Sequence, residues 1–304
     1  MEEIRSILPF KMYEIINAEE KMDKLQEIRI KINKPIIVSV NNKEIILNYV
    51  PSIDDVKNIL QKISNYSLYA FEEEIKQGFI TIKGGHRIGL SGQWVIENGC
   101  VKTIKSVYSL NIRICREVIG CSNSLMKYIV DGERIYNTII ISPPKCGKTT
   151  LIRDISRNLS NGFPKLKISG KKVSIIDERS EIAASYNGIP QMDVGIRTDV
   201  FDNCLKSSGM MMAIRSMAPE VIICDEIGTN KDIEALLSAY NCGVNIITTI
   251  HGNNIEDLYK RIVFKELLDN KVIERVIVLS NRKGIGTVED IINVISGRKE
   301  GECV

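Results

Sequence analysis

The stretch Ile139-Ile-Ile-Ser-Pro-Pro-Lys-Cys-Gly-Lys-Thr-Thr150 decides the fold of this chain. It joins an apolar strand to a loop that ends in Gly-Lys-Thr, and an amphipathic helix follows from residue 151. This order is typical of a phosphate-binding loop, in which backbone N–H groups and a helix N-terminus surround the β-phosphate of a nucleotide. The sequence therefore predicts a nucleotide site at this loop.

Each residue of the loop has an expected role. Lys148 is expected to reach the β- and γ-phosphates, and the Thr149 hydroxyl to hold Mg²⁺. The motif departs from its usual form because Ser142 stands where the first glycine is common, and two prolines without N–H groups follow it. The expected nucleotide contacts are Pro144, Lys145, Cys146, Gly147, Lys148, Thr149 and Thr150, with the N–H donors beginning at Lys145.

Two further apolar strands end in pairs of carboxylates. Asp225, at the end of Glu220-Val-Ile-Ile-Cys-Asp225, is expected to hold Mg²⁺, and the next residue, Glu226, to polarise a water. Val173-Ser-Ile-Ile-Asp177 repeats the design, with Asp177 as a metal ligand and Glu178 as a catalytic carboxylate. For this second pair a salt-bridge cluster with Arg179 remains an alternative.

Three more side chains are candidates for contact with the γ-phosphate. His251 follows the apolar run Ile246-Ile-Thr-Thr-Ile250, where it is either a phosphate sensor or a hydrogen-bonded structural residue. Arg197 and Arg215 lie between the second and third strands of this half. Each arginine either stabilises the transferred phosphate or pairs with Asp193 or Asp199.

The second half of the chain alternates apolar strands with amphipathic helices. Strands are expected at 139–141, 173–176, 221–224, 246–250 and 276–279. Continuous apolar strands joined by helices are typical of a parallel sheet covered on both faces. We therefore expect residues 131–304 to form a doubly wound α/β domain with a mostly parallel sheet.

The first 130 residues show a different pattern. In 27–32, isoleucines alternate with charged residues, which predicts a half-buried strand, and several short strands follow with hairpin turns at Gly84-Gly85 and Ser91-Gly92. We expect residues 1–130 to form a smaller mixed α/β domain, which ends near Asp131-Gly-Glu-Arg134.

Composition excludes several classes of protein. The 41 basic and 38 acidic residues leave a net charge of +3, too small to indicate nucleic-acid binding. No apolar run approaches the ~18 residues of a spanning helix, and the acidic start is unlike a signal peptide. Eight cysteines without a Cys-x-x-Cys pair, beside two histidines, favour reduced thiols over a zinc site. We expect a soluble cytoplasmic protein.

Taken together, these runs resemble a known family. The order of phosphate loop, acidic strand, arginine-rich link, Asp-Glu strand and Thr-Thr-Ile-His-Gly is similar to the secretion-ATPase branch of the RecA-like ATPases, the hexameric motors of type II and type IV secretion. Within that branch, six runs resemble the stage III sporulation protein AA family: Ser67-Leu-Tyr-Ala70, Gly78-Phe-Ile-Thr81, Gly84-Gly-His-Arg-Ile-Gly89, Ile176-Asp-Glu-Arg-Ser-Glu-Ile182, Gly188-Ile-Pro-Gln-Met-Asp-Val-Gly-Ile-Arg-Thr-Asp-Val200 and Gly209-Met-Met-Met-Ala-Ile-Arg-Ser-Met-Ala-Pro-Glu-Val-Ile-Ile-Cys-Asp-Glu-Ile-Gly228.

The resemblance implies a RecA-like P-loop core that hydrolyses ATP with Mg²⁺. It also implies a homo-oligomeric ring, a hexamer, docked on membrane-protein partners at the base of the channel between mother cell and forespore, on the mother-cell side. It favours Glu178 as the base that activates water, whereas the residues alone leave Glu226 as a rival. Relatives bring arginines to the nucleotide from the N-terminal domain or its link, a position matched here by Arg113 and Arg116.

Two other functions remain as alternatives. A nucleic-acid-remodelling ATPase would need a basic surface interleaved with aromatic residues, which the sequence does not show. A nucleotide-gated structural ring would bind ATP but hydrolyse it slowly.

Overall fold

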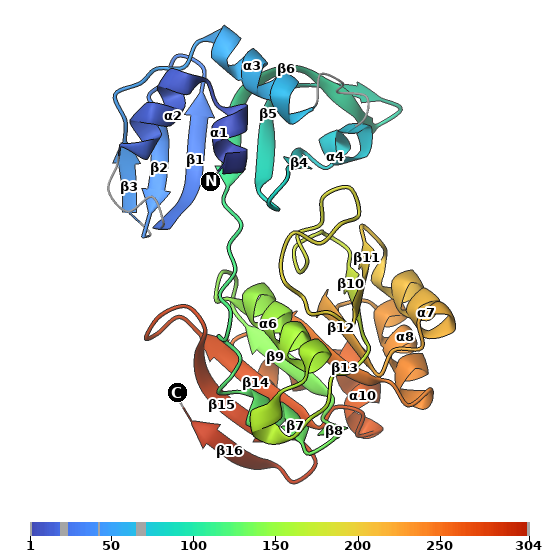
Figure 1. Cartoon of the computed structure of the whole chain (residues 1–304). Helices are drawn as coiled ribbons and strands as arrows, with labels where there is room; N and C mark the ends of the chain where they lie inside the picture. Colours follow the sequence, from blue (N-terminus) through green and yellow to red (C-terminus); the bar gives the residue numbers. More distant parts are fainter. Residues whose placement is uncertain (1, 19–23, 42, 65–70, 303–304) are drawn as a thin grey trace. The chain divides into compact units, whose positions relative to one another are not determined.

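The computed structural model describes residues 2–18, 24–41, 43–64 and 71–302, in two compact units (Figure 1). Unit 1 contains the chain up to Arg116 together with Ala184–Gln191, and unit 2 contains Glu117–Ala183 and the chain from Met192 onward. The run Ser67-Leu-Tyr-Ala70 lies outside the described residues. In the described part, no helix is long and apolar enough to cross a membrane.

The division falls at Arg116–Glu117, ahead of the boundary between residues 130 and 131 that the sequence suggests. The intervening segment includes helix α5 (Met126–Ile129), and its side chains Leu125, Met126 and Ile129 are buried in the core of unit 2. Their apolar contacts explain why this segment belongs to the second unit.

Unit 1 is built on an antiparallel sheet of six strands in the order β3-β2-β1-β6-β5-β4. Its strands are β1 (Leu25–Lys31), β2 (Ile37–Val40), β3 (Lys43–Ile46), β4 (Phe79–Thr81), β5 (Arg87–Glu97) and β6 (Cys100–Arg113). Its helices are α1 (Glu2–Ile7), α2 (Phe10–Asn17), α3 (Ile53–Ile63) and α4 (Glu72–Lys76). Ser52 and Asp55 start α3 with a reciprocal capping box. The unit has a hydrophobic core of its own.

The predicted hairpin turn at Ser91-Gly92 is wrong, because β5 continues through it to Glu97. The β5–β6 register shifts between Ser91 and Gly92, which marks an irregularity in the ladder. A Cβ at position 92 would lie 1.9 Å from the Ser106 carbonyl oxygen. Glycine is therefore needed here for close approach of two backbones and not for a turn.

Unit 2 contains an eight-stranded sheet in the order β11-β10-β12-β13-β9-β14-β15-β16. The strands from β11 to β14 in this order are parallel, and β15 and β16 extend the sheet antiparallel. The strands are β9 (Thr138–Ser142), β10 (Val173–Asp177), β11 (Thr198–Asp202), β12 (Val221–Glu226), β13 (Asn245–His251), β14 (Arg275–Ser280), β15 (Thr287–Asn293) and β16 (Arg298–Glu302), with a separate two-stranded ribbon of β7 (Val130–Asp131) and β8 (Arg134–Ile135).

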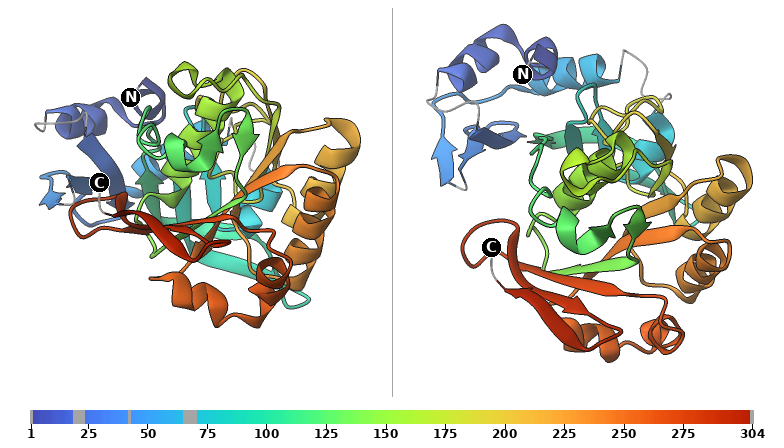
Figure 2. Two further views of the ribbon diagram at one scale, coloured as in Figure 1. Left: turned by 90° about the horizontal axis from the view of Figure 1, so that it is seen from below. Right: turned by 60° about the horizontal axis from the view of Figure 1, so that its bottom comes forward.

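Helices cover both faces of this sheet (Figures 1 and 2). One face packs against α5 and α6 (Lys148–Asn161), and the other against α7 (Lys206–Ser216), α8 (Asn230–Asn241), α9 (Ile255–Tyr259) and α10 (Lys265–Asp269). Each face of the sheet has its own hydrophobic core, and alternate residues of β9 belong to different cores. Ile140 lies in the core on the α6 side, and Ile139 and Ile141 lie in the core on the other side. The predicted doubly wound α/β fold with a mostly parallel sheet is confirmed.

This topology positions the site. Because β9, β10, β12 and β13 are parallel, their carboxyl ends meet at one edge of the sheet, where open α/β sheets bind ligands. The predicted loop, carboxylates and histidine all follow these strand ends.

Candidate active site

The loop between β9 and α6 has the backbone shape of an anion-binding nest. Lys145 and Gly147 have left-handed φ angles of 62° and 86°, a conformation from which anion-binding nests are built. A Cβ at Gly147 would lie 3.0 Å from Cγ2 of Ile285, which adds a second reason for glycine at this position. Helix α6 begins at the next residue, Lys148, and presents its positive N-terminal end to the loop.

Lys148, His251 and Glu226 are brought together as the sequence predicts for one site. The Lys148 ammonium donates to the Ser142 carbonyl at 3.3 Å and to Nδ1 of His251 at 2.5 Å. His251 Nε2 lies 3.0 Å from Glu226 Oε2, so the ring accepts from lysine on one side and donates to the carboxylate on the other. Burial lowers the pKa of Lys148, and the negative charge of Glu226 acts against this shift.

A lysine that the sequence did not single out joins the two acidic strand ends. The Lys206 ammonium, at the start of α7, forms ion pairs with Oε2 of Glu178 and, at 3.1 Å, with Oδ1 of Asp225. Its side chain is only 8% exposed. Burial acts to lower the pKa of Lys206, but the two carboxylates outweigh it and raise this pKa above its usual value. Burial likewise raises the pKa of Asp225, and Lys206 opposes that rise.

Asp177 has a role in this structure that differs from the predicted one. Its carboxylate is fully buried and accepts hydrogen bonds from the backbone N–H groups of Glu181, Ile182 and Ala183, at 2.8 to 2.9 Å. Burial raises the pKa of Asp177 to about 6, and these three donors oppose the rise. Both oxygens are thus engaged in anchoring the turn that follows Glu178, and the metal role of Asp177 stays a prediction.

Arg153 of α6 holds the same turn from the opposite direction. Its guanidinium donates to the carbonyl of Ile182 and, at 2.8 Å, to the carbonyl of Glu181. The turn after β10 is therefore fixed to the helix of the phosphate loop through both its N–H and its C=O groups. Nothing in the spacing of Arg153 distinguishes it from other helix residues, so its contact with this turn could not be predicted from the sequence.

Within unit 2, Arg197 and Arg215 do not gather at the loop that carries Lys148. Arg197 donates to the carbonyl of Ser160 at 2.9 Å, near the end of α6, which puts it about 18 Å along the helix from Lys148 at roughly 1.5 Å per residue. Arg215 is exposed in the last turn of α7, about 13 Å along that helix from Lys206. Arg113 is exposed at the end of β6 in unit 1. The role of each in catalysis stays a prediction.

The side chains at the strand ends suit Mg²⁺ held together with a nucleotide. Among the described residues, no three His, Cys, Asp or Glu side chains gather into a metal site of their own. Protein sites for Mg²⁺ that also use nucleotide phosphates need only one or two oxygen ligands from side chains. The Thr149 hydroxyl at the loop and the Asp225 carboxylate at the end of β12 carry oxygens of this kind, and their role as Mg²⁺ ligands stays a prediction.

Two pockets border the phosphate-loop segment. One is lined by Pro143, Pro144, His251, Gly252, Asn253, Asp257, Lys260 and Arg261. Here the Arg261 guanidinium donates to the His251 carbonyl at 2.5 Å, so it supports the strand end that carries the histidine. Arg261 was also missed, because nothing in the sequence connects a basic residue ten positions after His251 with that strand end.

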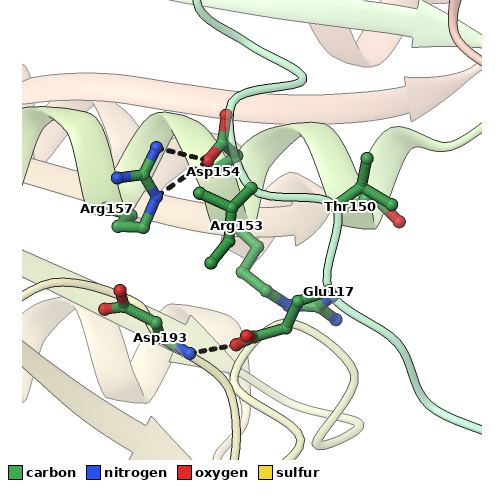
Figure 3. Close-up of a pocket in the computed structure, with 8 residues that line it drawn as sticks. Glu117, Thr150, Arg153, Asp154, Arg157 and Asp193 are labelled. Atoms are coloured by element: carbon green, nitrogen blue, oxygen red, sulfur yellow. Dashed lines mark hydrogen bonds and ion pairs between the residues drawn. The ribbon is translucent and has the colours of Figure 1, made fainter.

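The second pocket is a hollow beside α6 (Figure 3). Asp154 pairs with Arg157 at 2.7 Å there, and the Glu117 carboxylate accepts from the backbone N–H of Asp193. Asp154 also accepts from the backbone N–H groups of Gly120 and Ser122. These bonds fix the segment after unit 1 to the helix of the phosphate loop.

Comparison with solved structures agrees with this architecture. The ATPase DotB of Legionella pneumophila superposes with a TM-score of 0.62 at 16% identity, over 96% of this chain and 79% of that one. The pilus retraction motor PilT with bound ADP superposes with a TM-score of 0.57 at 13% identity, over 88% and 76% of the two chains. At these identities the likeness concerns the fold.

Sequence comparison is more specific. The family model described as "Sporulation stage III, protein AA" matches residues 1–299. Stage III sporulation protein AA of Bacillus subtilis is 44% identical over 96% of this chain and 94% of its own length. A match that runs through both units, at this identity, means that the chain belongs to the stage III sporulation protein AA family.

Proposed function

We propose that this protein is a Mg²⁺-dependent ATP hydrolase that works as a secretion-type motor in sporulation. The observation that carries the proposal is the meeting of Lys148, His251 and Glu226 beside a nest-shaped loop at the carboxyl edge of a RecA-like sheet. The similarity in fold to DotB and PilT supports a nucleotide-driven function.

The residues divide the work of hydrolysis. The N–H groups of Lys145 to Thr150 and the N-terminus of α6 bind the phosphates, and Lys148 leaves His251 to reach them. Thr149 and Asp225 would hold Mg²⁺, which neutralises charge on the phosphates when it is bound. Electrostatic stabilisation of this kind supplies most of the rate in phosphoryl transfer.

Glu178 is our proposed base, with Glu226 as its rival. Glu178 follows a strand end, and the turn after it is fixed by Asp177 and Arg153, which suits a group that must orient a water. Glu226 is hydrogen-bonded to His251 and is suited to sense the γ-phosphate together with it. Substitution of each glutamate by glutamine distinguishes these roles, because the base variant loses turnover but retains ATP binding.

Arginines complete the site from a neighbouring subunit in this proposal. Arg197 contacts the end of α6 that is far from Lys148, and Arg215 lies in the last turn of α7, so in this proposal they act on a nucleotide only across a subunit boundary. Arg113 is the corresponding candidate from unit 1. A ring of six subunits, docked on membrane-protein partners at the mother-cell end of the channel to the forespore, would bring them there.

The test is phosphate release as a function of protein concentration, with the mass in solution measured in the same samples. Wild type is compared with Lys148→Ala and Glu178→Ala, and with Lys165→Ala as a control at an exposed lysine beyond the end of α6. We expect Mg²⁺-dependent turnover that rises with assembly, persists in the control and falls at least 100-fold in both site variants. Absence of turnover at every assembly state and Mg²⁺ concentration would contradict the motor proposal.

One observation favours a second function, a nucleotide-gated ring with little turnover. Both proposed catalytic groups are already paired, Lys148 with His251 and Glu178 with Lys206. Tight ATP binding and ATP-dependent assembly without phosphate release would identify this function in the same samples.

A further inference from the structure

We propose that Lys206 is a positioning residue for ATP hydrolysis, a built-in cation that ties the base candidate Glu178 to the metal-holding Asp225. The inference rests on the proposed function and adds to it a residue of α7, which packs on the opposite face of the sheet from α6. It starts from one contact, the Lys206 ammonium between carboxylates from two neighbouring strands.

Burial makes this contact a specific feature and not a surface ion pair. The Lys206 side chain is 8% exposed and that of Asp225 is 12% exposed, so neither charge is solvated by bulk water. Burial destabilises an ammonium group unless carboxylates surround it closely. Lys206 therefore remains where both partners are within reach, and the two carboxylates cannot separate without the loss of one of its two ion pairs.

The charges of the cluster set its affinity for a divalent cation. Two carboxylates and one ammonium leave one net negative charge on the trio. Without Lys206, Glu178 and Asp225 would present two negative charges, and their mutual repulsion would favour any additional cation between them. Lys206 thus lowers the attraction of the site for Mg²⁺ and at the same time holds Glu178 in one position.

The backbone around Lys206 explains why it can do this. Lys206 is the first residue of α7, and residues 203–205 connect it to β11, which pairs with the strand that precedes Glu178. The Asn203 N–H donates to the Asp177 carbonyl at 3.0 Å, so the chain just before α7 is tied to the end of β10. The backbone from which the Lys206 side chain extends is therefore fixed relative to Asp177.

The test measures the Mg²⁺ concentration required for half-maximal binding of a fluorescent ADP analogue, together with turnover. In Lys206→Met we expect this concentration to fall about tenfold, because one positive charge beside Asp225 is lost, while kcat falls at least tenfold because Glu178 is no longer held. Lys206→Arg keeps the charge and should keep the Mg²⁺ requirement within about twofold. Lys231→Met, the same change at an exposed position of α8, should alter neither quantity.

A double variant tests whether Glu178 is the partner that matters. Lys206→Met combined with Glu178→Gln restores the net charge of the trio, so its Mg²⁺ requirement should return to the wild-type value. If Lys206→Met does not fold, the double variant is compared with Glu178→Gln alone, and the double variant should need about tenfold less Mg²⁺. Circular dichroism establishes folding in each case.

The outcomes separate this inference from the proposed function. An unchanged Mg²⁺ requirement in folded Lys206→Met, or in the double variant relative to Glu178→Gln, would overturn the role of Lys206 while ATP hydrolysis by wild type stands. A wild type that binds no nucleotide would overturn the proposed function, and the role of Lys206 in hydrolysis with it.

Discussion

Asp154 shows how much a single buried side chain organises in unit 2. Its side chain is 4% exposed and accepts hydrogen bonds from the N–H groups of Gly120 and Ser122, the Ser122 hydroxyl and the Arg157 guanidinium. Burial acts to raise the pKa of Asp154, but these donors outweigh it and lower this pKa below the usual 3.8. The carboxylate is therefore stabilised in its charged form by the fold.

Asp154→Asn should reduce the free energy of unfolding by about 3 kcal/mol at pH 7, because an amide cannot accept all four bonds. Since the folded pKa lies below the unfolded value, the stabilisation is complete above the unfolded pKa and is lost as the pH falls through the folded pKa. Urea unfolding of both proteins between pH 7 and pH 3 measures this. A difference that stays constant over that range would contradict the assignment.

At the residue scale the sequence predicted the groups that follow strand ends. Glu226 and His251 were predicted from their positions at the ends of apolar strands and Lys148 from the Gly-Lys-Thr loop, and the structure brings the three together. Lys206 and Arg153 were not predicted, because each reaches its partner from a helix. The pattern of apolar strands does not indicate which helix residues lie near the strand ends. Three-dimensional packing alone determines which helix residues face a strand end.

At the scale of elements, α6 does more than present Lys148. Arg153 on this helix and Asp177 on β10 together hold the turn at 181–183 by its carbonyl and N–H groups. The phosphate loop and the acidic strand end are thereby joined within unit 2. A change in the conformation of either part is therefore expected to alter the conformation of the other.

Arg153→Met should increase amide hydrogen exchange at Glu181, Ile182 and Ala183 by at least tenfold, because the turn loses both bonds to α6. Hydrogen exchange followed by mass spectrometry of the peptide that spans the turn measures it. Arg157→Met is the matched control, since Arg157 lies one turn further along α6 and pairs with Asp154. Equal exchange at the turn in both variants would show that Arg153 does not hold it.

Two glycines of the β5–β6 hairpin should respond differently to alanine. Gly92→Ala is expected to destabilise unit 1 by about 3 kcal/mol, because its Cβ would overlap the Ser106 carbonyl and the strands must separate. Gly99→Ala has open space and is expected to cost only about 1 kcal/mol, for its φ of 78°. Thermal unfolding followed by circular dichroism compares them, and similar losses in the two variants would contradict the bulge assignment.

Three strands of unit 2 were not predicted from the sequence, and for the same reason. β11, β15 and β16 lie toward the edges of the sheet, and β11 carries two charged residues and β16 four. Their sequences lack the continuous apolar run that identified the buried parallel strands. The central strands were predictable because burial on both faces dictates their composition.

At the scale of the whole molecule, each unit is stabilised by hydrophobic clusters of its own, and the described residues form one cluster in unit 1 and two in unit 2. Ile112 on β6 belongs to the core of unit 1, and Ile223 on β12 belongs to a core of unit 2; both side chains are fully buried. Domains with their own cores are able to open separately. Unfolding of this chain is therefore not expected to follow a single two-state transition.

Ile112→Ala and Ile223→Ala should each cost about 3 kcal/mol, but each in its own unit. Hydrogen exchange in mild denaturant, read peptide by peptide, should show lost protection in unit 1 for the first variant and in unit 2 for the second. Loss of protection in both units at the same denaturant concentration, in either variant, would show that the two units unfold as one.

The segment Ala184–Gln191 belongs to unit 1 although it is encoded far from the rest of that unit. The Gly84 N–H donates to the Gln191 side-chain oxygen at 2.9 Å, which ties the segment to the turn before β5. During synthesis at about 5 to 20 residues per second, the ribosome reaches residue 191 several seconds after residue 116. The N-terminal unit is consequently completed only once the phosphate loop and the acidic strand have been translated. Folding of unit 1 therefore ends only after that part of unit 2 has been synthesised.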